Sequence, residues 1–204
     1  MREKDSSGFA LRMTYMLIFI KKAVAVCLAK AISLPLKELL EMRIAGIAED
    51  SIVDGPGLRV SVFTQGCPHG CEGCHNREAQ EFEGGQEMSV EEIIAIIKKN
   101  ELADGVTLTG GEPFCQPEDC AKIARAAKAA GLNIWTYSGY TLEELCELSK
   151  ENTGIMELLS VTDVLVDGRF ILAEKSFDVK WRGSKNQRLI DVPRSLAANK
   201  AAEL

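Results

Sequence analysis

The sequence predicts an α/β domain built on a parallel sheet, and three observations support this fold class. From Met42 onward, short apolar segments alternate with amphipathic ones, and strand–helix alternation of this kind is typical of parallel sheets. The chain has 204 residues, enough for one domain with a real core. Its 46% hydrophobic and 26% charged residues are those of a soluble globular protein.

The first half of the domain contains three predicted strands and one helix. Residues 43–48 form the first strand, and residues 58–64 form the second, which is rich in β-branched and aromatic side chains. Residues 54–57, Asp-Gly-Pro-Gly, have the chemistry of a turn. Residues 89–100 form a helix with a Ser/Glu capping box and apolar residues at helical spacing. Residues 105–109 form the third strand.

The second half continues the same alternation. Residues 117–130 form a helix that begins with proline and is followed by glycine. Residues 132–137 form the fourth strand, Thr141 caps another helix, and residues 163–167 form the fifth strand. The chain from Phe170 onward has no clear assignment.

The two ends of the chain are predicted to lie outside the main domain, residues 42–195. Residues 1–41 carry a net charge of +3 in an acidic protein, and we interpret them as an extension that arises from a start codon assigned too early, with Met42 as the true start. The apolar run 13–20 is too short to span a bilayer, and a weak membrane anchor is the alternative interpretation of this extension. We expect residues 196–204 to be a flexible tail.

Composition narrows the class of function. The net charge of −6 argues against a general nucleic-acid binder. There are seven cysteines, an odd number, and three of them lie within eight residues. This pattern indicates a reducing compartment and a metal site better than a disulfide framework. We therefore expect a cytoplasmic protein with neither a nucleic-acid nor a membrane partner.

Four unusual segments each follow a predicted strand. Active sites of parallel α/β sheets lie at the carboxyl ends of the strands, so these segments are expected to share one face. They are the cysteine-rich segment after the second strand and residues 110–113, 138–140 and 168–170 after the third, fourth and fifth strands.

Cys67, Cys71 and Cys74 form the strongest candidate site. A proline and two glycines lie among them and disfavour a helix, so a loop around a metal centre is the better interpretation. Three thiolates can hold three irons of a cubane cluster and leave the fourth open for a small molecule. Zinc usually takes four ligands from two half-sites; only one half-site exists here, although His69 or His75 can add a ligand. Zinc and inert thiols remain as alternatives.

The Cys-x3-Cys-x2-Cys spacing resembles that of the radical-SAM superfamily, and Gly110-Gly111-Glu112-Pro113 is similar to its glycine-rich motif. The resemblance implies one 4Fe-4S cluster on the three cysteines and S-adenosylmethionine on its open iron. The reduced cluster then passes one electron to the sulfonium, and a 5′-deoxyadenosyl radical results. Glycines let a backbone approach a ligand closely, and a carboxylate complements an ammonium group. The cofactor contacts expected are Gly73, His75, Asn76, Gly110, Gly111 and Glu112.

Further segments resemble one branch of this superfamily. Gly73 stands where an aromatic residue is usual, as in the branch that activates anaerobic ribonucleotide reductase. Residues 54–59 are similar to a segment shared by glycyl-radical activating enzymes. Residues 135–140, 166–170 and 181–188 resemble signatures of the reductase-activating branch itself.

The resemblance covers about residues 42–195 and implies a partial, open (β/α) TIM-like barrel of the radical-SAM type. The implied activity is that of an oxidoreductase that removes a hydrogen atom from one glycine of the large subunit of anaerobic ribonucleotide reductase. A flavodoxin- or ferredoxin-like protein is the implied electron donor. The basic stretch 174–194 either docks the partner, neutralises the carboxylate of the cofactor or is a solvated face.

Three other functions remain open at this point. An activator of pyruvate formate-lyase has the same chemistry on a different partner, and a small radical-SAM enzyme can act on a metabolite. A zinc-binding interaction module would have no catalytic activity.

Under each of these functions, we expect Cys115, Cys120 and Cys146 to bind no second cluster, because a further cubane needs about three or four convergent thiolates.

Overall fold

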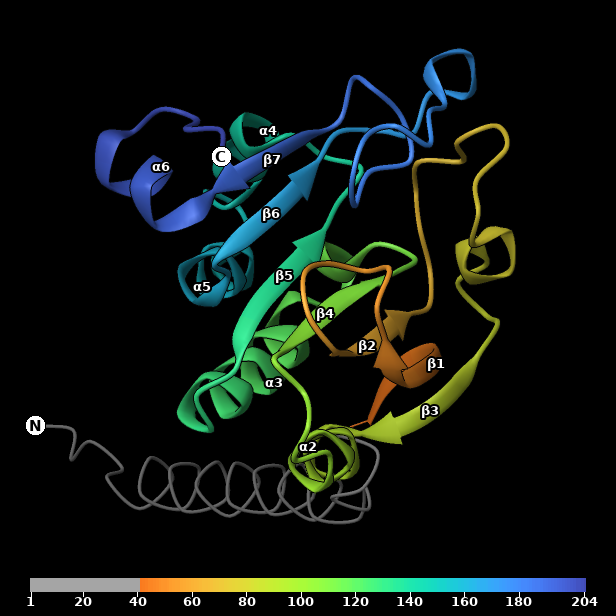
Figure 1. Ribbon diagram of the computed structural model, residues 1–204, viewed down its shortest axis with the longest axis vertical. Coiled ribbons are helices and arrows are strands. Elements are labelled where there is room, and N and C mark those ends of the chain that lie inside the picture. The colour runs from red at the N-terminus through yellow and green to blue at the C-terminus, as the bar shows by residue number, and fades with distance from the viewer. Residues whose placement is uncertain (1–40) are drawn as a thin grey trace, which may run out of the picture. The chain divides into compact units, whose positions relative to one another are not determined.

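The computed structural model describes residues 41–204, which form one seven-stranded sheet with five α-helices in this part of the chain (Figure 1). The predicted extension lies outside the described residues, apart from Glu41. The strands are β1 (Glu41–Ser51), β2 (Arg59–Thr64), β3 (Gln86–Ser89), β4 (Gly105–Gly110), β5 (Asn133–Tyr137), β6 (Val164–Asp167) and β7 (Arg188–Asp191). The helices are α2 (Val90–Lys99), α3 (Pro117–Ala129), α4 (Leu142–Leu148), α5 (Thr153–Val161) and α6 (Val192–Ala198).

The sheet is mixed, with the order β3-β1-β2-β4-β5-β6-β7. Its centre, β2-β4-β5-β6, is parallel, as predicted from the strand–helix alternation. The antiparallel strands β1 and β3 extend one edge, and the antiparallel strand β7 extends the other. The edge strands β3 and β7 do not pair with each other, so the sheet is open and does not close into a barrel.

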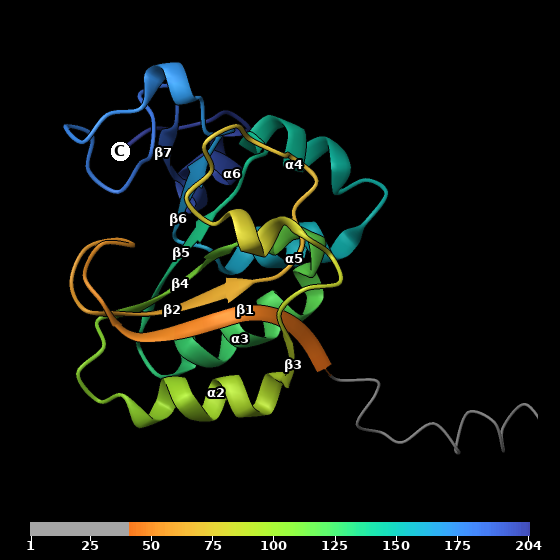
Figure 2. The same ribbon diagram turned by 90° about the vertical axis from the view of Figure 1, so that its right-hand side faces the viewer.

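The core lies between one face of the sheet and the helices (Figure 2). Alternate residues of the central strands, such as Val62, Leu108 and Ile134, are fully buried in one cluster with helix residues such as Ile97 and Ile123. This is the consequence of a period-2 strand facing a period-3.6 helix. The predicted capping boxes at Ser89 and Thr141 are both present and fix where α2 and α4 begin.

The other face of the sheet holds a buried arginine. Arg59 donates from Nε to Thr107 Oγ1 (2.6 Å) and from Nη1 to Asn133 Oδ1 (2.8 Å). Burial lowers the pKa of Arg59 to about 10, partly offset by nearby acidic groups. Asp54 accepts from Ser61 Oγ at 2.8 Å, so the predicted 54–57 turn folds back onto this face.

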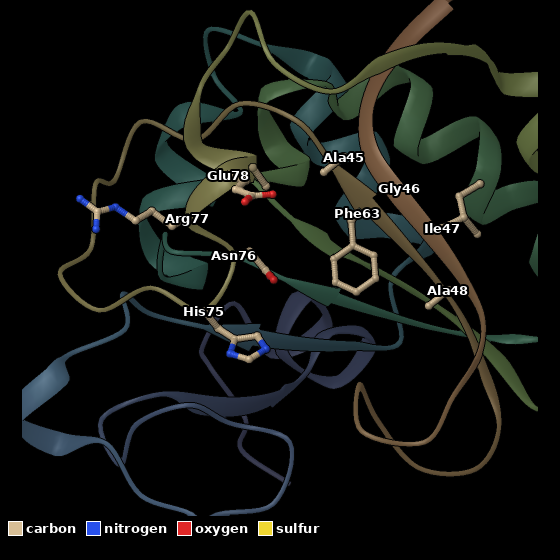
Figure 3. Close-up of a pocket in the computed structure, with 10 residues that line it drawn as sticks. Ala45, Gly46, Ile47, Ala48, Phe63, His75, Asn76, Arg77 and Glu78 are labelled. Atoms are coloured by element: carbon tan, nitrogen blue, oxygen red, sulfur yellow. The ribbon is translucent and has the colours of Figure 1, made fainter.

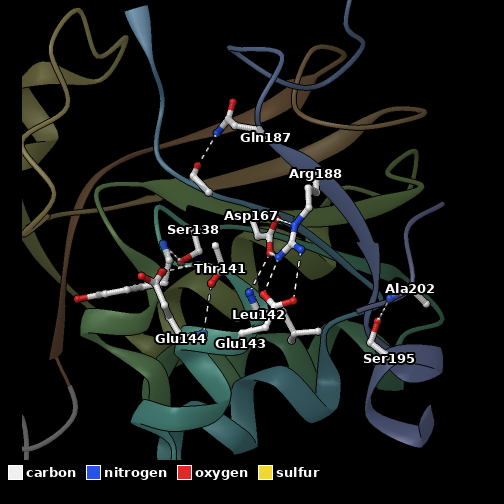
Figure 4. Close-up of polar contacts among 12 residues, drawn as sticks. Ser138, Thr141, Leu142, Glu143, Glu144, Asp167, Gln187, Arg188, Ser195 and Ala202 are labelled. Carbon is white, nitrogen blue, oxygen red and sulfur yellow. Dashed lines mark hydrogen bonds and ion pairs between the residues drawn. The ribbon is translucent and has the colours of Figure 1, made fainter. Parts of the chain in front are cut away.

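The C-terminal residues fold back along β7. The Leu204 N–H donates to Leu189 O at 2.9 Å, and the Asp191 N–H donates to Ala202 O at 2.9 Å. The tail therefore supplies the free edge of β7 with main-chain partners, which stabilises an otherwise unpaired strand edge. The Ser195 hydroxyl adds a bond from the Ala202 N–H (Figure 4).

The described residues contain no helix long and apolar enough to cross a membrane.

Candidate active site

The four predicted segments do share one face, at the carboxyl ends of the parallel strands. They line a cavity of about 120 Å³. The cysteine loop provides Cys67, His69, Cys71 and Cys74; the end of β4 provides Thr109, Gly110 and Gly111; the end of β5 provides Tyr137, Ser138 and Gly139; the remaining residues are Gln80, Gly168, Phe170 and Gln187.

The cysteines lie on a loop, as predicted, and not on a helix. Gly70 and Gly73 have φ angles of +59° and +72°, a region that favours glycine. The base of the loop is closed by two main-chain bonds, from Gly66 N–H to Ala79 O (2.9 Å) and from Cys67 N–H to Gln80 O (3.0 Å). The chain thus leaves β2, winds around the cavity and returns to its starting point.

The three thiols have the chemistry that a 4Fe-4S cluster requires. All three are free and partly exposed, and they line the same cavity. Burial raises the pKa of Cys67, a main-chain hydrogen bond at His69 partly lowers it, and the negative charge of Glu112 raises it. Bound iron would reverse this effect, because a coordinating thiol is deprotonated by the metal charge.

The described residues contain no three His, Cys, Asp or Glu side chains grouped closely enough to hold a single metal ion. A cubane takes each thiolate on a different iron, so its cysteines need not converge on one point. The donor set, three thiols of one half-site, fits a cluster better than zinc, which usually takes four ligands from two half-sites.

Glu112 is the most heavily bonded side chain at the site and is fully buried. Its carboxylate accepts from the Ser138 hydroxyl (3.0 and 3.1 Å), from the Gly139 N–H (2.9 Å) and from the Phe114 N–H (3.1 Å). It also contacts His69. This places Glu112 behind the cavity wall, where it ties the end of β4 to the end of β5.

His69 was considered above only as a possible metal ligand, and its contact with Glu112 was not predicted from the sequence. Its Nε2 lies 2.8 Å from Glu112 Oε2, and its side chain is only 3% exposed. Its ring packs edge-on against Tyr140 at 4.4 Å between centroids. A Cβ on Gly139 would lie 2.2 Å from the imidazole, so only glycine leaves room for it. The cysteine loop is thereby fastened to β4 and β5, a contact that spans 43 residues of sequence.

Gly110 and Gly111 are required by packing alone. A Cβ on Gly110 would lie 2.6 Å from Phe63 Cα, and one on Gly111 would lie 2.4 Å from Gly66 O. Both distances are shorter than any normal contact, and the obstructing atoms are backbone. The glycine pair lets β4 end directly against the cysteine loop and leaves its main chain on the cavity wall.

Comparisons with known proteins agree with this geometry. Residues 53–190 match the family model described as "4Fe-4S single cluster domain". Three similar proteins are each called "Anaerobic ribonucleoside-triphosphate reductase-activating protein". The protein of Salmonella typhi is 36% identical over 144 residues, 67% of this chain and 90% of its own length. Those of Escherichia coli K12 and Enterobacteria phage T4 are 35% and 37% identical over 147 residues, 67% of this chain and 90% and 86% of their own lengths.

The chain belongs to this family of 4Fe-4S single-cluster activating proteins. The family match spans the cysteine loop and all four parallel strands, and it favours an iron–sulfur cluster over zinc. The single cluster in the family description also agrees with the expectation that Cys115, Cys120 and Cys146 hold none. Cys120 is fully buried in the core, where it is a small apolar residue.

In this family member, the segment 168–187 covers the cavity beside the cysteine loop. Trp181, at a φ of +57°, packs edge-on against Trp135 with 5.3 Å between ring centroids. Tyr137 donates its hydroxyl to Trp181 O at 2.8 Å. Leu172 occupies the space beside Gly73, whose Cβ would lie 2.9 Å from Leu172 Cδ1. A larger residue at position 73 would therefore displace this segment.

His75 and Asn76, two of the expected cofactor contacts, do not line the cysteine cavity. They line a separate one together with Phe63 and residues of β1 (Figure 3). Gly73 lies at the surface beside Leu172 and is also absent from the cysteine cavity wall. Of the six expected contacts, Gly110 and Gly111 line the cavity and Glu112 lies directly behind it.

Proposed function

We propose that this protein is a radical-SAM activase that generates a glycyl radical on anaerobic ribonucleotide reductase. The observation that best supports this proposal is the cavity in which three free thiols lie next to the ends of three further parallel strands. The relatives, named as activating proteins of the anaerobic reductase, support the choice of protein substrate.

The cysteine loop would hold the cluster through Cys67, Cys71 and Cys74. When bound, the cluster would supply the one-electron reduction of S-adenosylmethionine on which removal of a hydrogen atom from the reductase glycine depends. The protein holds and shields the reactants, as in other cofactor enzymes. The thiols are half-buried rather than surface groups, which is consistent with that shielding role.

The ends of β4 and β5 would bind the methionine part of S-adenosylmethionine. Gly110 and Gly111 offer main-chain groups on the cavity wall without side chains in the way. Glu112 places a negative charge immediately behind them, held by Ser138 and Gly139. A carboxylate fixed in this way favours an ammonium group in the cavity and does not have to reorganise when the ligand binds.

The open sheet suits a protein substrate. A closed barrel would leave only its mouth accessible, whereas here the edge strands β3 and β7 stay apart. We interpret this arrangement as the partial barrel of the radical-SAM type, with its gap as the way in for a loop of the reductase.

Electron paramagnetic resonance tests the proposal directly. The reconstituted protein is incubated without oxygen with the large reductase subunit, S-adenosylmethionine and a reductant. We expect a stable glycyl radical on the reductase and 5′-deoxyadenosine in proportion to it. Pyruvate formate-lyase, offered in the same way, should give no radical. A radical on the lyase alone, or no radical on either protein, would contradict the proposal.

A further inference from the structure

A second cavity, of about 440 Å³, lies on the other side of the cysteine loop (Figure 3). One wall is the stretch Ala45–Ala48 of β1, and the other is the chain that follows the third cysteine, residues 75–79. The side chains of Phe63, His75 and Asn76 point into it, while Arg77 points away. It shares no lining residue with the cysteine cavity.

The two cavities are nevertheless immediate neighbours. His75 follows Cys74 in the chain. Asn76 donates from Nδ2 to Gly110 O at 3.5 Å, and Gly110 lines the cysteine cavity. Phe63 is also in close contact with Gly110, whose Cβ would lie 2.6 Å from Phe63 Cα. A group bound in the second cavity would thus lie one layer of residues from the cluster loop.

The chemistry of this cavity suits a neutral stretch of polypeptide. On the β1 side, the small side chains of alanine and glycine leave room for a polypeptide chain to approach closely. The amide of Asn76 and the imidazole of His75 can each donate to or accept from a peptide group. The charged side chains at the cavity are Arg77 and Glu78, one of each sign, and both are exposed. The lining has no cluster of cations that would favour a phosphate or carboxylate ligand.

The edge of β1 gives an independent reason to expect a peptide. β1 pairs with β3 only from Glu41 to Ile44. Beyond Ile44, that edge of β1 has no strand partner among the described residues, and the stretch without a partner includes the cavity wall, Ala45–Ala48. The pairing of β1 with β2 is also irregular between Ile44 and Gly46. Free strand edges bind extended peptides through main-chain hydrogen bonds.

We propose that this cavity and the edge of β1 along Ala45–Ala48 receive the glycine-bearing segment of the protein substrate as an extended strand; the edge ends there, because the Glu49 carbonyl accepts from Asn100 Nδ2 at 2.6 Å. The proposal rests on the proposed function and adds the place where the reductase segment lies. It also reassigns His75 and Asn76 from the cofactor to the protein substrate.

Gly46 offers a sharp test. It lines the cavity, has no positive φ and has nothing within 4 Å of where a Cβ would lie. Gly46→Phe therefore adds a Cβ without a clash and places a ring in the cavity beside Phe63. The matched control is Glu49→Phe, on the same strand but exposed and outside the cavity lining. The iron content and the thermal unfolding midpoint of each cluster-loaded variant verify that it folds. Ala48→Leu is a second variant that fills the same cavity with a smaller side chain.

The measurement is the amount of glycyl radical formed per S-adenosylmethionine cleaved, with the reductase present. We expect this ratio to fall at least about ten-fold in Gly46→Phe, about 1.4 kcal/mol of lost substrate binding, and to stay unchanged in Glu49→Phe. An unchanged ratio in Gly46→Phe overturns the inference, and so does an equal loss of cleavage and radical, which assigns the cavity to the cofactor. If the wild-type protein forms no radical at all, the proposed function itself fails.

Discussion

Two residues far apart in the sequence, His69 and Glu112, set the geometry of the cysteine loop. Of the contacts at the buried Glu112 carboxylate, the one with His69 alone comes from that loop. Breaking it removes the side-chain bond from the loop to Glu112, and through Glu112 to β5, while main-chain contacts at Gly66 and Gly110 still join the loop to the end of β4. We interpret His69 as a positioning residue, because its side chain faces Glu112 and Tyr140.

His69→Ala should therefore loosen the loop without removing a thiol. A hydrogen bond lost at a buried charged group costs about 1–3 kcal/mol, so we expect the urea midpoint of unfolding to fall. The signal of the reduced cluster in electron paramagnetic resonance should also change less when S-adenosylmethionine is added. His69→Gln, which can still donate to Glu112, should recover part of both effects.

His75→Ala is the matched control for the unfolding measurement, because it removes an exposed imidazole from the same loop. An equal fall in the unfolding midpoint for both alanine variants would show that the His69–Glu112 contact has no special role.

At the scale of elements, sequence patterns were sufficient where local chemistry decides the structure. The helices α2 and α4 begin at their capping boxes, and the parallel strands follow their runs of apolar residues. By contrast, β3 (Gln-Glu-Met-Ser) and β7 (Arg-Leu-Ile-Asp) are short and half polar, and they become strands only because β1 and β6 offer edges. The same distinction applies to the candidate site. Its cysteines and glycines could be predicted from local sequence patterns, whereas the contact of His69 with Glu112 depends on how distant elements pack.

One ion network holds three elements together at the β7 edge. Arg188 donates to both oxygens of the buried Asp167 at 2.9 and 2.5 Å, and it also contacts Glu143 at 2.7 Å (Figure 4). These bonds raise the pKa of Arg188, so it remains charged. Asp167 further accepts from the Leu142 N–H at the start of α4. The end of β6 is thereby tied to β7 and to α4.

We expect Arg188→Leu to lower the free energy of unfolding by about 3–5 kcal/mol, because it leaves the Asp167 carboxylate buried without its ionic partner. Arg125→Leu is the matched control, since Arg125 pairs with Glu157 and both side chains are nearly half exposed; it should cost less than about 1 kcal/mol. Urea unfolding of both variants measures the difference. A cost for Arg188→Leu as small as that of the control would show that the network does not hold the edge.

At the scale of the whole molecule, the described chain separates a helix-covered core from the cysteine cavity. The core cluster contains Cys120 but none of the three loop cysteines. The cysteines, the glycine motif and the covering segment 168–187 all lie at the carboxyl ends of the strands. Thus the packing that stabilises the domain lies against one face of the sheet, whereas the proposed cluster-binding thiols lie at the carboxyl ends of its strands.

The number of clusters follows from this separation. Cys115 is exposed, Cys120 is buried in the core and Cys146 is on α4, and none of the three lines the cysteine cavity. We expect about four irons per chain after anaerobic reconstitution, as one cubane requires. Replacing Cys115, Cys120 and Cys146 together by alanine should leave that number nearly unchanged, whereas replacing Cys67, Cys71 or Cys74 singly should abolish cleavage of S-adenosylmethionine. Iron near eight per chain, or loss of the cluster signal in the triple variant, would mean that a second cluster exists.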